Sequence, residues 1–111
     1  MNNRTVILIL FLAALLEAGG DAVIRAGIRS PQLPTRIVLF LLGACVLFAY
    51  GRLVNSPGWD FGRLIGLYVV FFFVTAQLIS WLGFRQLPSR PLIAGGILIV
   101  SGGLVIALAE S

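Results

Sequence analysis

The chain has 111 residues, of which 59% are hydrophobic and only 11% are charged, whereas a soluble domain is about 25% charged. Because so short a chain cannot hide this apolar excess in one core, the composition excludes an ordinary soluble domain and predicts an all-α membrane protein. The formal net charge of +4 comes from arginines dispersed at the edges of apolar runs, so it does not indicate nucleic-acid binding.

The first two predicted elements are apolar runs long enough to cross a bilayer, which takes about 20 helical residues. The first, at about 5–24, carries Glu17 and Asp21 in its second half. It ends before a segment with two prolines, which cannot continue a helix. The second is predicted at about 35–54, and a Pro-Gly-containing segment at 55–60 should form the turn that follows it.

The third and fourth predicted elements complete a single domain of four transmembrane helices. The third, at about 62–84, is rich in aromatic residues and ends at Arg85. The fourth, at about 91–109, follows a second proline-containing loop, with Pro91 in its first turn, where proline is tolerated.

Two pairs of glycines in the fourth predicted helix are each seven residues apart. Gly95 and Gly102 therefore share one helix face, and Gly96 and Gly103 share another. A glycine face lets a neighbouring backbone approach closely. The neighbour could be another helix of the same chain or a second copy of the chain, and the sequence leaves both alternatives open.

Loop charges bear on orientation in the membrane. On the side of the two termini there are three arginines, namely Arg4, Arg52 and Arg63. On the other side there are four, namely Arg29, Arg36, Arg85 and Arg90. A difference of one is too small for the positive-inside rule to fix an orientation. A unique orientation would place both termini outside the cytoplasm, and insertion in both orientations is the alternative.

The charged residues of the first helix are the best candidates for function. Glu17, Asp21 and Arg25 are spaced i, i+4, i+8 and so share one helix face. A charge at the bilayer centre costs about 2.5–3.5 kcal/mol, so this face should look into a bundle or a wet cavity. Glu17, the deepest of the three, could exchange a proton for a cation, which is the minimal chemistry of an antiporter. The alternative is a cluster that neutralises itself, with Arg25 capping Asp21.

The chain lacks the residues on which most metal sites and catalytic triads depend. It has no histidine, and Cys45 is its only cysteine. Zinc sites and Ser-His-Asp triads require such residues. We therefore expect no metal, no cofactor, no catalytic residues and no enzymatic activity.

Several short motifs resemble one family of transporters. Four spans in a short chain, with Leu-Glu-x-x-Gly at 16–20 and a base eight residues after the acid, are similar to the small multidrug resistance (SMR) superfamily of the drug/metabolite transporters. The proline-containing loop after residue 53, followed by Gly62-Arg63 and then Tyr68, is closer to the YnfA-like branch of that superfamily. The similarity covers nearly the whole chain.

The resemblance implies an EmrE-like bundle in the bacterial plasma (inner) membrane that works as a homodimer, often antiparallel. It implies that Glu17 is the essential acid of a joint proton and substrate site, that Tyr68 lies near this site, and that Gly95 and Gly102 form a dimer face. One departure is the third helix, in which Val70-Phe71-Phe72 replaces the flexible Gly-x-Gly of the drug exporters.

The implied function is a proton-coupled exporter of small or lipophilic cations. Its partners would be membrane lipid, protons, a small cationic substrate and a second copy of the chain, with no nucleic acid. The alternative is a structural or regulatory membrane module that does not transport and that assembles through its helices. In that case the polar face of the first helix would serve only to hold helices together.

Overall fold

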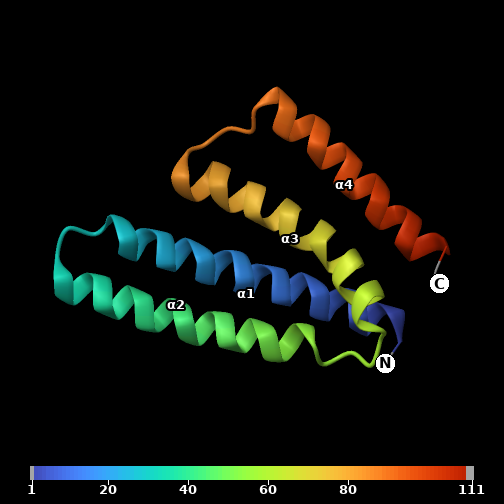
Figure 1. Cartoon of the computed structure of the whole chain (residues 1–111), viewed down its shortest axis with the longest axis horizontal. Coiled ribbons are helices and arrows are strands. Elements are labelled where there is room, and N and C mark those ends of the chain that lie inside the picture. Colours follow the sequence, from blue (N-terminus) through green and yellow to red (C-terminus); the bar gives the residue numbers. More distant parts are fainter. Residues whose placement is uncertain (1, 110–111) are drawn as a thin grey trace.

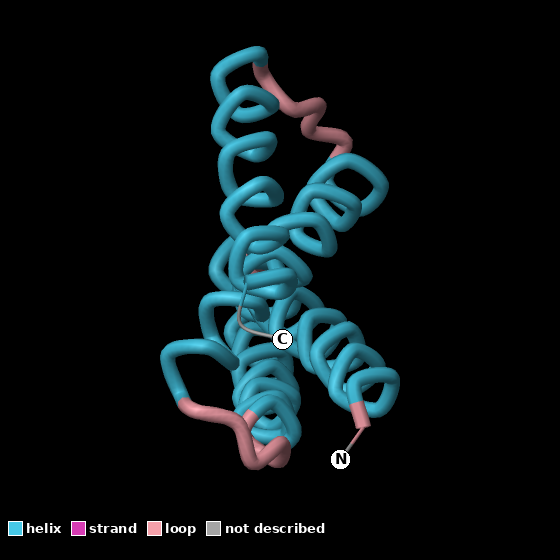
Figure 2. Tube along the Cα trace, turned by 90° about the vertical axis from the view of Figure 1, so that its right-hand side faces the viewer, coloured by secondary structure: helices cyan, strands magenta, loops and turns pink. Residues whose placement is uncertain are grey.

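Four α-helices joined by short loops make up the protein (Figures 1 and 2), namely α1 (Asn3–Arg29), α2 (Leu33–Val54), α3 (Phe61–Phe84) and α4 (Arg90–Ala109). The structure is a computed structural model and describes residues 2–109. No strand occurs within that range. Each helix is long and apolar enough to cross a membrane, so the predicted all-α fold class with four spans is confirmed.

The first helix is longer than the predicted 5–24 at both ends. It begins at Asn3 because the side chain of Asn2 accepts a hydrogen bond from the Thr5 N–H at 2.8 Å, as a helix N-cap does. It continues to Arg29 because arginine is a good helix former, and the first residue unable to continue the helix is Pro31.

The other helices each begin slightly before the predicted residue. α2 starts at Leu33 because Pro34 occupies the first turn, where its missing N–H needs no partner. α3 starts at Phe61 rather than 62. α4 starts at Arg90 rather than 91, and the Ser89 hydroxyl oxygen accepts the Leu92 N–H at 3.3 Å.

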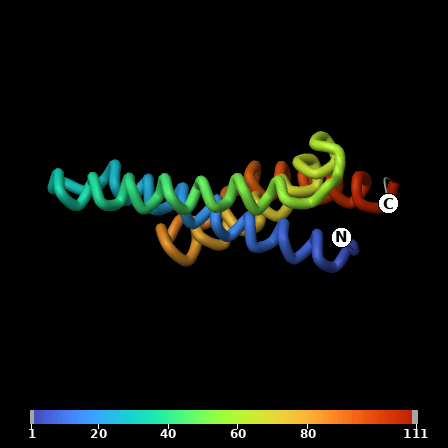
Figure 3. The backbone as a smooth tube through the Cα atoms, turned by 90° about the horizontal axis from the view of Figure 1, so that it is seen from below, coloured from blue at the N-terminus to red at the C-terminus, as the bar shows by residue number. Residues whose placement is uncertain are grey.

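The helices form a layer in which α1 lies between α2 and α3, and α4 packs on α3 (Figure 1). Within residues 2–109 the backbones of no other pair of helices come this close, although the Tyr50 ring of α2 contacts the Tyr68 ring of α3. The layer measures 49 × 34 × 19 Å and looks flat from below (Figure 3). The fold is therefore two helical hairpins, α1–α2 and α3–α4, that meet mainly where α1 packs on α3.

Glycines allow the helices within each hairpin to approach closely. A Cβ atom at Gly20 of α1 would lie 2.8 Å from Leu47 of α2, and one at Gly96 of α4 would lie 2.7 Å from Phe73 of α3. Gly103 is likewise buried against α3. By contrast, nothing lies within 4 Å of a Cβ atom built at Gly95 or Gly102. One of the two predicted glycine faces therefore packs inside the chain, and the other is open.

Most large apolar side chains point away from the interior. Leu41 of α2, Leu82 of α3 and Leu98 of α4 are 63%, 71% and 74% exposed, respectively. In water such a surface would be unfavourable, whereas lipid tails are as apolar as leucine. The buried core is small and lies mainly at the α1–α3 contact, where it contains Val6, Leu10, Ala13, Ala14, Leu64 and Tyr68.

Candidate functional site

A hydrogen bond between two helices places Glu17 beside Tyr68. The Tyr68 hydroxyl donates to the Glu17 Oε1 atom at 2.7 Å and lies 3.4 Å from the Ala13 carbonyl oxygen. Glu17 is half-buried near the middle of α1, about 18 Å from the helix end at Arg29. Tyr68 on α3 is only 4% exposed. The bond therefore crosses the contact that joins the two hairpins.

Aromatic rings from two helices surround this hydrogen bond. The ring of Tyr50 on α2 lies 5.6 Å from that of Tyr68, and the ring of Phe72, one turn further along α3, lies 6.3 Å from it, both between centroids. Such distances are typical of favourable aromatic pairs. Three helices thus contribute to the site, and their packing restricts the Tyr68 ring so that its hydroxyl stays near α1.

The sequence did not single out Tyr50 as a site residue. The chain has only two tyrosines, and both lie within two turns of the loop that joins α2 to α3. Two phenols at similar depth on helices connected by one short loop would have been the signal that they meet.

The carboxylate of Glu17 has no basic partner in the described part of the chain. Its short hydrogen bond comes from the Tyr68 hydroxyl, and no arginine nitrogen of residues 2–109 lies within 4 Å of it. A carboxylate without a fixed counter-ion in an apolar environment is strongly stabilised by any proton or cation that reaches it. Among residues 2–109, no three His, Cys, Asp or Glu side chains gather as metal ligands would.

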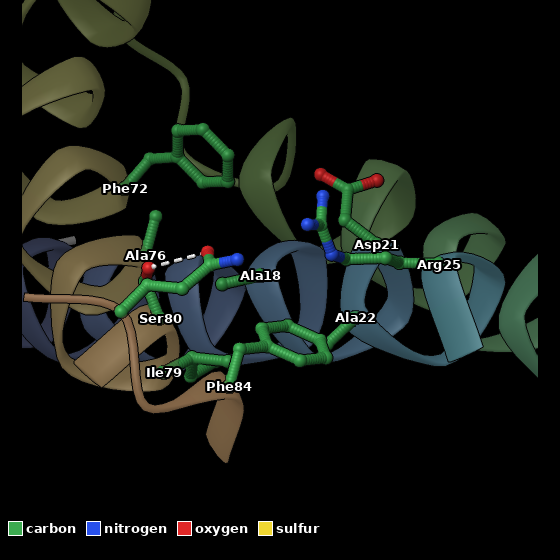
Figure 4. Close-up of a pocket in the computed structure, with 10 residues that line it drawn as sticks. Ala18, Asp21, Ala22, Arg25, Phe72, Ala76, Ile79, Ser80 and Phe84 are labelled. Carbon is green, nitrogen blue, oxygen red and sulfur yellow. Dashed lines mark hydrogen bonds between the residues drawn. The ribbon is translucent and has the colours of Figure 1, made fainter. Parts of the chain in front are cut away.

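The other two charged residues of the predicted face lie further along α1. Asp21 and Arg25 line a pocket of about 290 Å³ between α1 and α3, and both leave α1 on the same side (Figure 4). The Arg25 Cζ atom lies 5.1 Å from the centroid of the Phe84 ring. Its Nε atom is buried with no hydrogen-bond partner. No ion pair forms among Glu17, Asp21 and Arg25.

The structure therefore divides the predicted site residues into three places. Glu17 and Tyr68 are joined by a hydrogen bond, and Asp21 and Arg25 line the neighbouring pocket. Gly95 and Gly102 lie on α4, which contacts α3 but not α1. Any role for these two glycines in the site would require a second copy of the chain.

Comparison with known proteins shows similarity to a group of bacterial membrane proteins. The chain is 28% identical over 103 residues to UPF0060 membrane proteins of Staphylococcus aureus strains JH9, Newman and N315, which covers 92% of this chain and 93% of theirs. No protein-family model and no solved structure matches the chain. The similarity thus extends over all four helices and the site between them.

Proposed function

We propose that this chain is a proton-coupled exporter of small or lipophilic cations and that it is related to the SMR superfamily, closest to the YnfA-like branch. The observation that carries the proposal is the Glu17 carboxylate, which lies deep in α1 and is held by a tyrosine hydroxyl instead of a fixed cation. The alternative of a self-neutralising cluster requires a base within ion-pair distance of the acid. Glu17 has none within 4 Å among residues 2–109.

Protons and cations would compete for the same carboxylate. A proton neutralises Glu17 and makes the site apolar, whereas the ionised form attracts a cation. The Tyr68 hydroxyl donates to the ionised carboxylate and fixes its position, and the Tyr50, Tyr68 and Phe72 rings offer π-faces to an organic cation. Because the two ligands exclude each other, inward movement of protons would drive cations outward.

The similarity to UPF0060 membrane proteins supports the membrane setting of this proposal, since it covers nearly the whole of both chains. We place the chain in the bacterial plasma (inner) membrane. The names of these relatives give no substrate, so the cation class rests on the site alone.

Transport can be tested directly in proteoliposomes with an imposed pH gradient. We expect the purified chain to concentrate a guanidinium, quaternary ammonium or polyaromatic cation in the more acidic compartment and to lose this activity when the gradient is collapsed. Absence of gradient-driven movement for all three cation types would contradict the proposal.

We also propose that the working unit is a homodimer. The isolated chain is an open layer whose α4 contacts only α3 within residues 2–109. No atom lies within 4 Å of a Cβ atom built at Gly95 or Gly102, its second glycine face. In a membrane, helices associate chiefly by close packing at small residues, so a second copy is a suitable partner for this face. An antiparallel arrangement would bring two Glu17 carboxylates into one site.

Substitutions on the two glycine faces should have different effects. We expect the double variant Gly95→Leu, Gly102→Leu to convert dimer to monomer while the helices stay folded, as measured by light scattering and circular dichroism in detergent. Gly103→Leu should instead destabilise the α3–α4 hairpin by about 1–3 kcal/mol, because the side chain overpacks a filled contact. Gly62→Leu, at an open position at the start of α3, is the matched control. Dimers that persist in the double variant would exclude this face.

A structural or regulatory module is the second candidate, and the open face of α4 is the observation that favours it. Such a module would assemble through Gly95 and Gly102 without using Glu17. It predicts that Glu17→Gln changes neither cation binding nor proton release, which separates it from the exporter.

A further inference from the structure

A second charged feature lies beside the Glu17–Tyr68 pair, toward the end of α1, and shares the Phe72 ring with it. It is the pocket of about 290 Å³ in Figure 4. Its polar lining consists of Asp21 and Arg25 from α1, Ser80 from α3 and Gln86 from the loop that follows. The remaining walls are alanine, isoleucine and phenylalanine side chains. The proposed exchange of proton and cation at Glu17 uses none of these four polar side chains.

Two opposite charges face this pocket without neutralising each other. Asp21 is exposed, and the Arg25 guanidinium lies over the Phe84 ring instead of near an acid. No carboxylate oxygen of residues 2–109 lies within 4 Å of the Arg25 nitrogens. The buried Nε atom of Arg25 also has no hydrogen-bond partner. The pocket therefore offers one negative and one positive group, and neither has a partner of opposite charge within 4 Å among residues 2–109.

We propose that this pocket binds a small zwitterion, with the ammonium of the ligand at Asp21 and its anionic group at Arg25. A simple cation would leave Arg25 unpaired, and a simple anion would leave Asp21 unpaired. A zwitterion neutralises both, and the pocket as a whole stays neutral. No Arg25 nitrogen lies within 4 Å of an Asp21 carboxylate oxygen, which suits a ligand whose charged ends are separated by several methylene groups.

Both a free zwitterion and a zwitterionic lipid headgroup offer these two charges. Figure 4 shows the Arg25 side chain running back along α1, so that its guanidinium lies level with the Asp21 carboxylate, as helical side chains point toward the N-terminus. The pocket therefore presents its two charges side by side, and the comparison of lipids described below distinguishes a free ω-amino acid from the headgroup of phosphatidylethanolamine.

The neutral polar groups of the pocket suit the anionic end of such a ligand. The Ser80 hydroxyl donates to the Gln86 Oε1 atom at 3.3 Å, which leaves the amide N–H groups of Gln86 for a ligand. An amide donor and a guanidinium together can bind a carboxylate. Binding of the zwitterion does not require transport. The inference rests on the proposed function only where the bound zwitterion is taken to be a transported substrate.

Binding is tested by calorimetric titration of the purified chain in detergent with three probes of similar size: γ-aminobutyrate, butylammonium and butyrate. We expect γ-aminobutyrate to bind at least about tenfold more tightly than either singly charged probe, because it pairs with both charges. Free glycine, in which the charges are too close, and ω-aminooctanoate, in which they are too far apart, should bind more weakly than γ-aminobutyrate.

Variants assign the effect to the two residues. Arg25→Gln and Asp21→Asn should each reduce γ-aminobutyrate affinity at least about tenfold. Arg29→Gln, on the next turn of α1 and outside the pocket, is the control and should leave the affinity unchanged. Circular dichroism shows that each variant is folded. Equal affinity for the three probes, or equal loss in all three variants, would overturn the proposal.

Two further measurements distinguish a free zwitterion from a lipid headgroup, and this pocket from the Glu17 carboxylate. If γ-aminobutyrate binding disappears in phosphatidylethanolamine nanodiscs but persists in phosphatidylglycerol nanodiscs, the pocket holds the lipid headgroup and the free zwitterion is the wrong ligand. Equal binding in both lipids supports the free zwitterion. Glu17→Gln should keep γ-aminobutyrate binding, so failure of the exchange at Glu17 and failure of this pocket would appear in different variants.

Discussion

Glu17→Gln is expected to abolish the binding of organic cations. The substitution keeps the size of the side chain and leaves an oxygen that can accept the Tyr68 hydroxyl, but it removes the negative charge. Removing one partner of a buried charge pair costs about 2–5 kcal/mol, so affinity should fall by about thirtyfold or more. Titration with a fluorescent polyaromatic cation measures the change.

The control for this prediction is Asp60→Asn. Asp60 is an exposed acid at the start of α3 and makes no side-chain capping hydrogen bond. Its loss changes net charge by the same amount as the loss of Glu17 but lies outside the site. Undiminished binding in Glu17→Gln, or an equal loss in Asp60→Asn, would show that cations do not bind at the Glu17 carboxylate.

Tyr68→Phe is expected to weaken cation binding while keeping the aromatic packing. The variant removes the hydroxyl that donates to Glu17 at 2.7 Å, but the ring remains between Tyr50 and Phe72. A hydrogen bond to a charged group contributes about 1.5–3 kcal/mol, so affinity should fall by about tenfold to a hundredfold. The same fluorescence titration compares this variant with the wild type.

Two related variants locate the cause of that loss. Tyr50→Phe removes the other phenol of the aromatic cluster, whose hydroxyl lies beside Tyr68 and Glu17. It keeps the 2.7 Å hydrogen bond from Tyr68 to Glu17 and should have the smaller effect. Tyr68→Leu removes the ring as well and should also lower the thermal stability in detergent, because Tyr68 is buried in the core. If Tyr50→Phe costs more affinity than Tyr68→Phe, the Tyr68 hydroxyl does not hold the Glu17 carboxylate for cation binding.

The sequence predicted the number and type of the helices because each apolar run is bounded by residues that end or begin helices. The predicted end of α1, at 24, is too early, since the apolar run stops there and Arg25 and Arg29 resemble flanking charges. In the structure both are helical, and the helix ends before Pro31. A charged residue near a membrane surface is compatible with helix, whereas a proline two residues on is not.

The arrangement of the site was less predictable. The spacing of Glu17, Asp21 and Arg25 showed that they share a face of one helix, but spacing within a helix says nothing about which other helix that face meets. Tyr68 entered the site through the family resemblance, and only packing of α1 on α3 explains its hydrogen bond to Glu17. Arg25 lies over the Phe84 ring at the end of α3 instead of pairing with an acid. The sequence near Arg25 could not predict this contact, because Phe84 belongs to another helix.

The two glycine faces of α4 also show that spacing within one helix does not identify the neighbour of a face. Gly95 with Gly102 and Gly96 with Gly103 have identical spacing, so periodicity cannot rank them. The direction in which α3 approaches decides which pair is used inside the chain, and that direction follows from the loop between α3 and α4 and from the positions of Phe73 and Val70.

Proton release on cation binding tests the shared proton and cation site most directly. A weakly buffered solution of the detergent-solubilised wild type is titrated with guanidinium, quaternary ammonium and polyaromatic cations while its pH is recorded, and Glu17→Gln is treated in the same way. We predict that at least one cation releases protons from the wild type and that none does so from the folded variant. Release of equal size from both proteins, or from neither, would contradict a shared proton and cation site at Glu17.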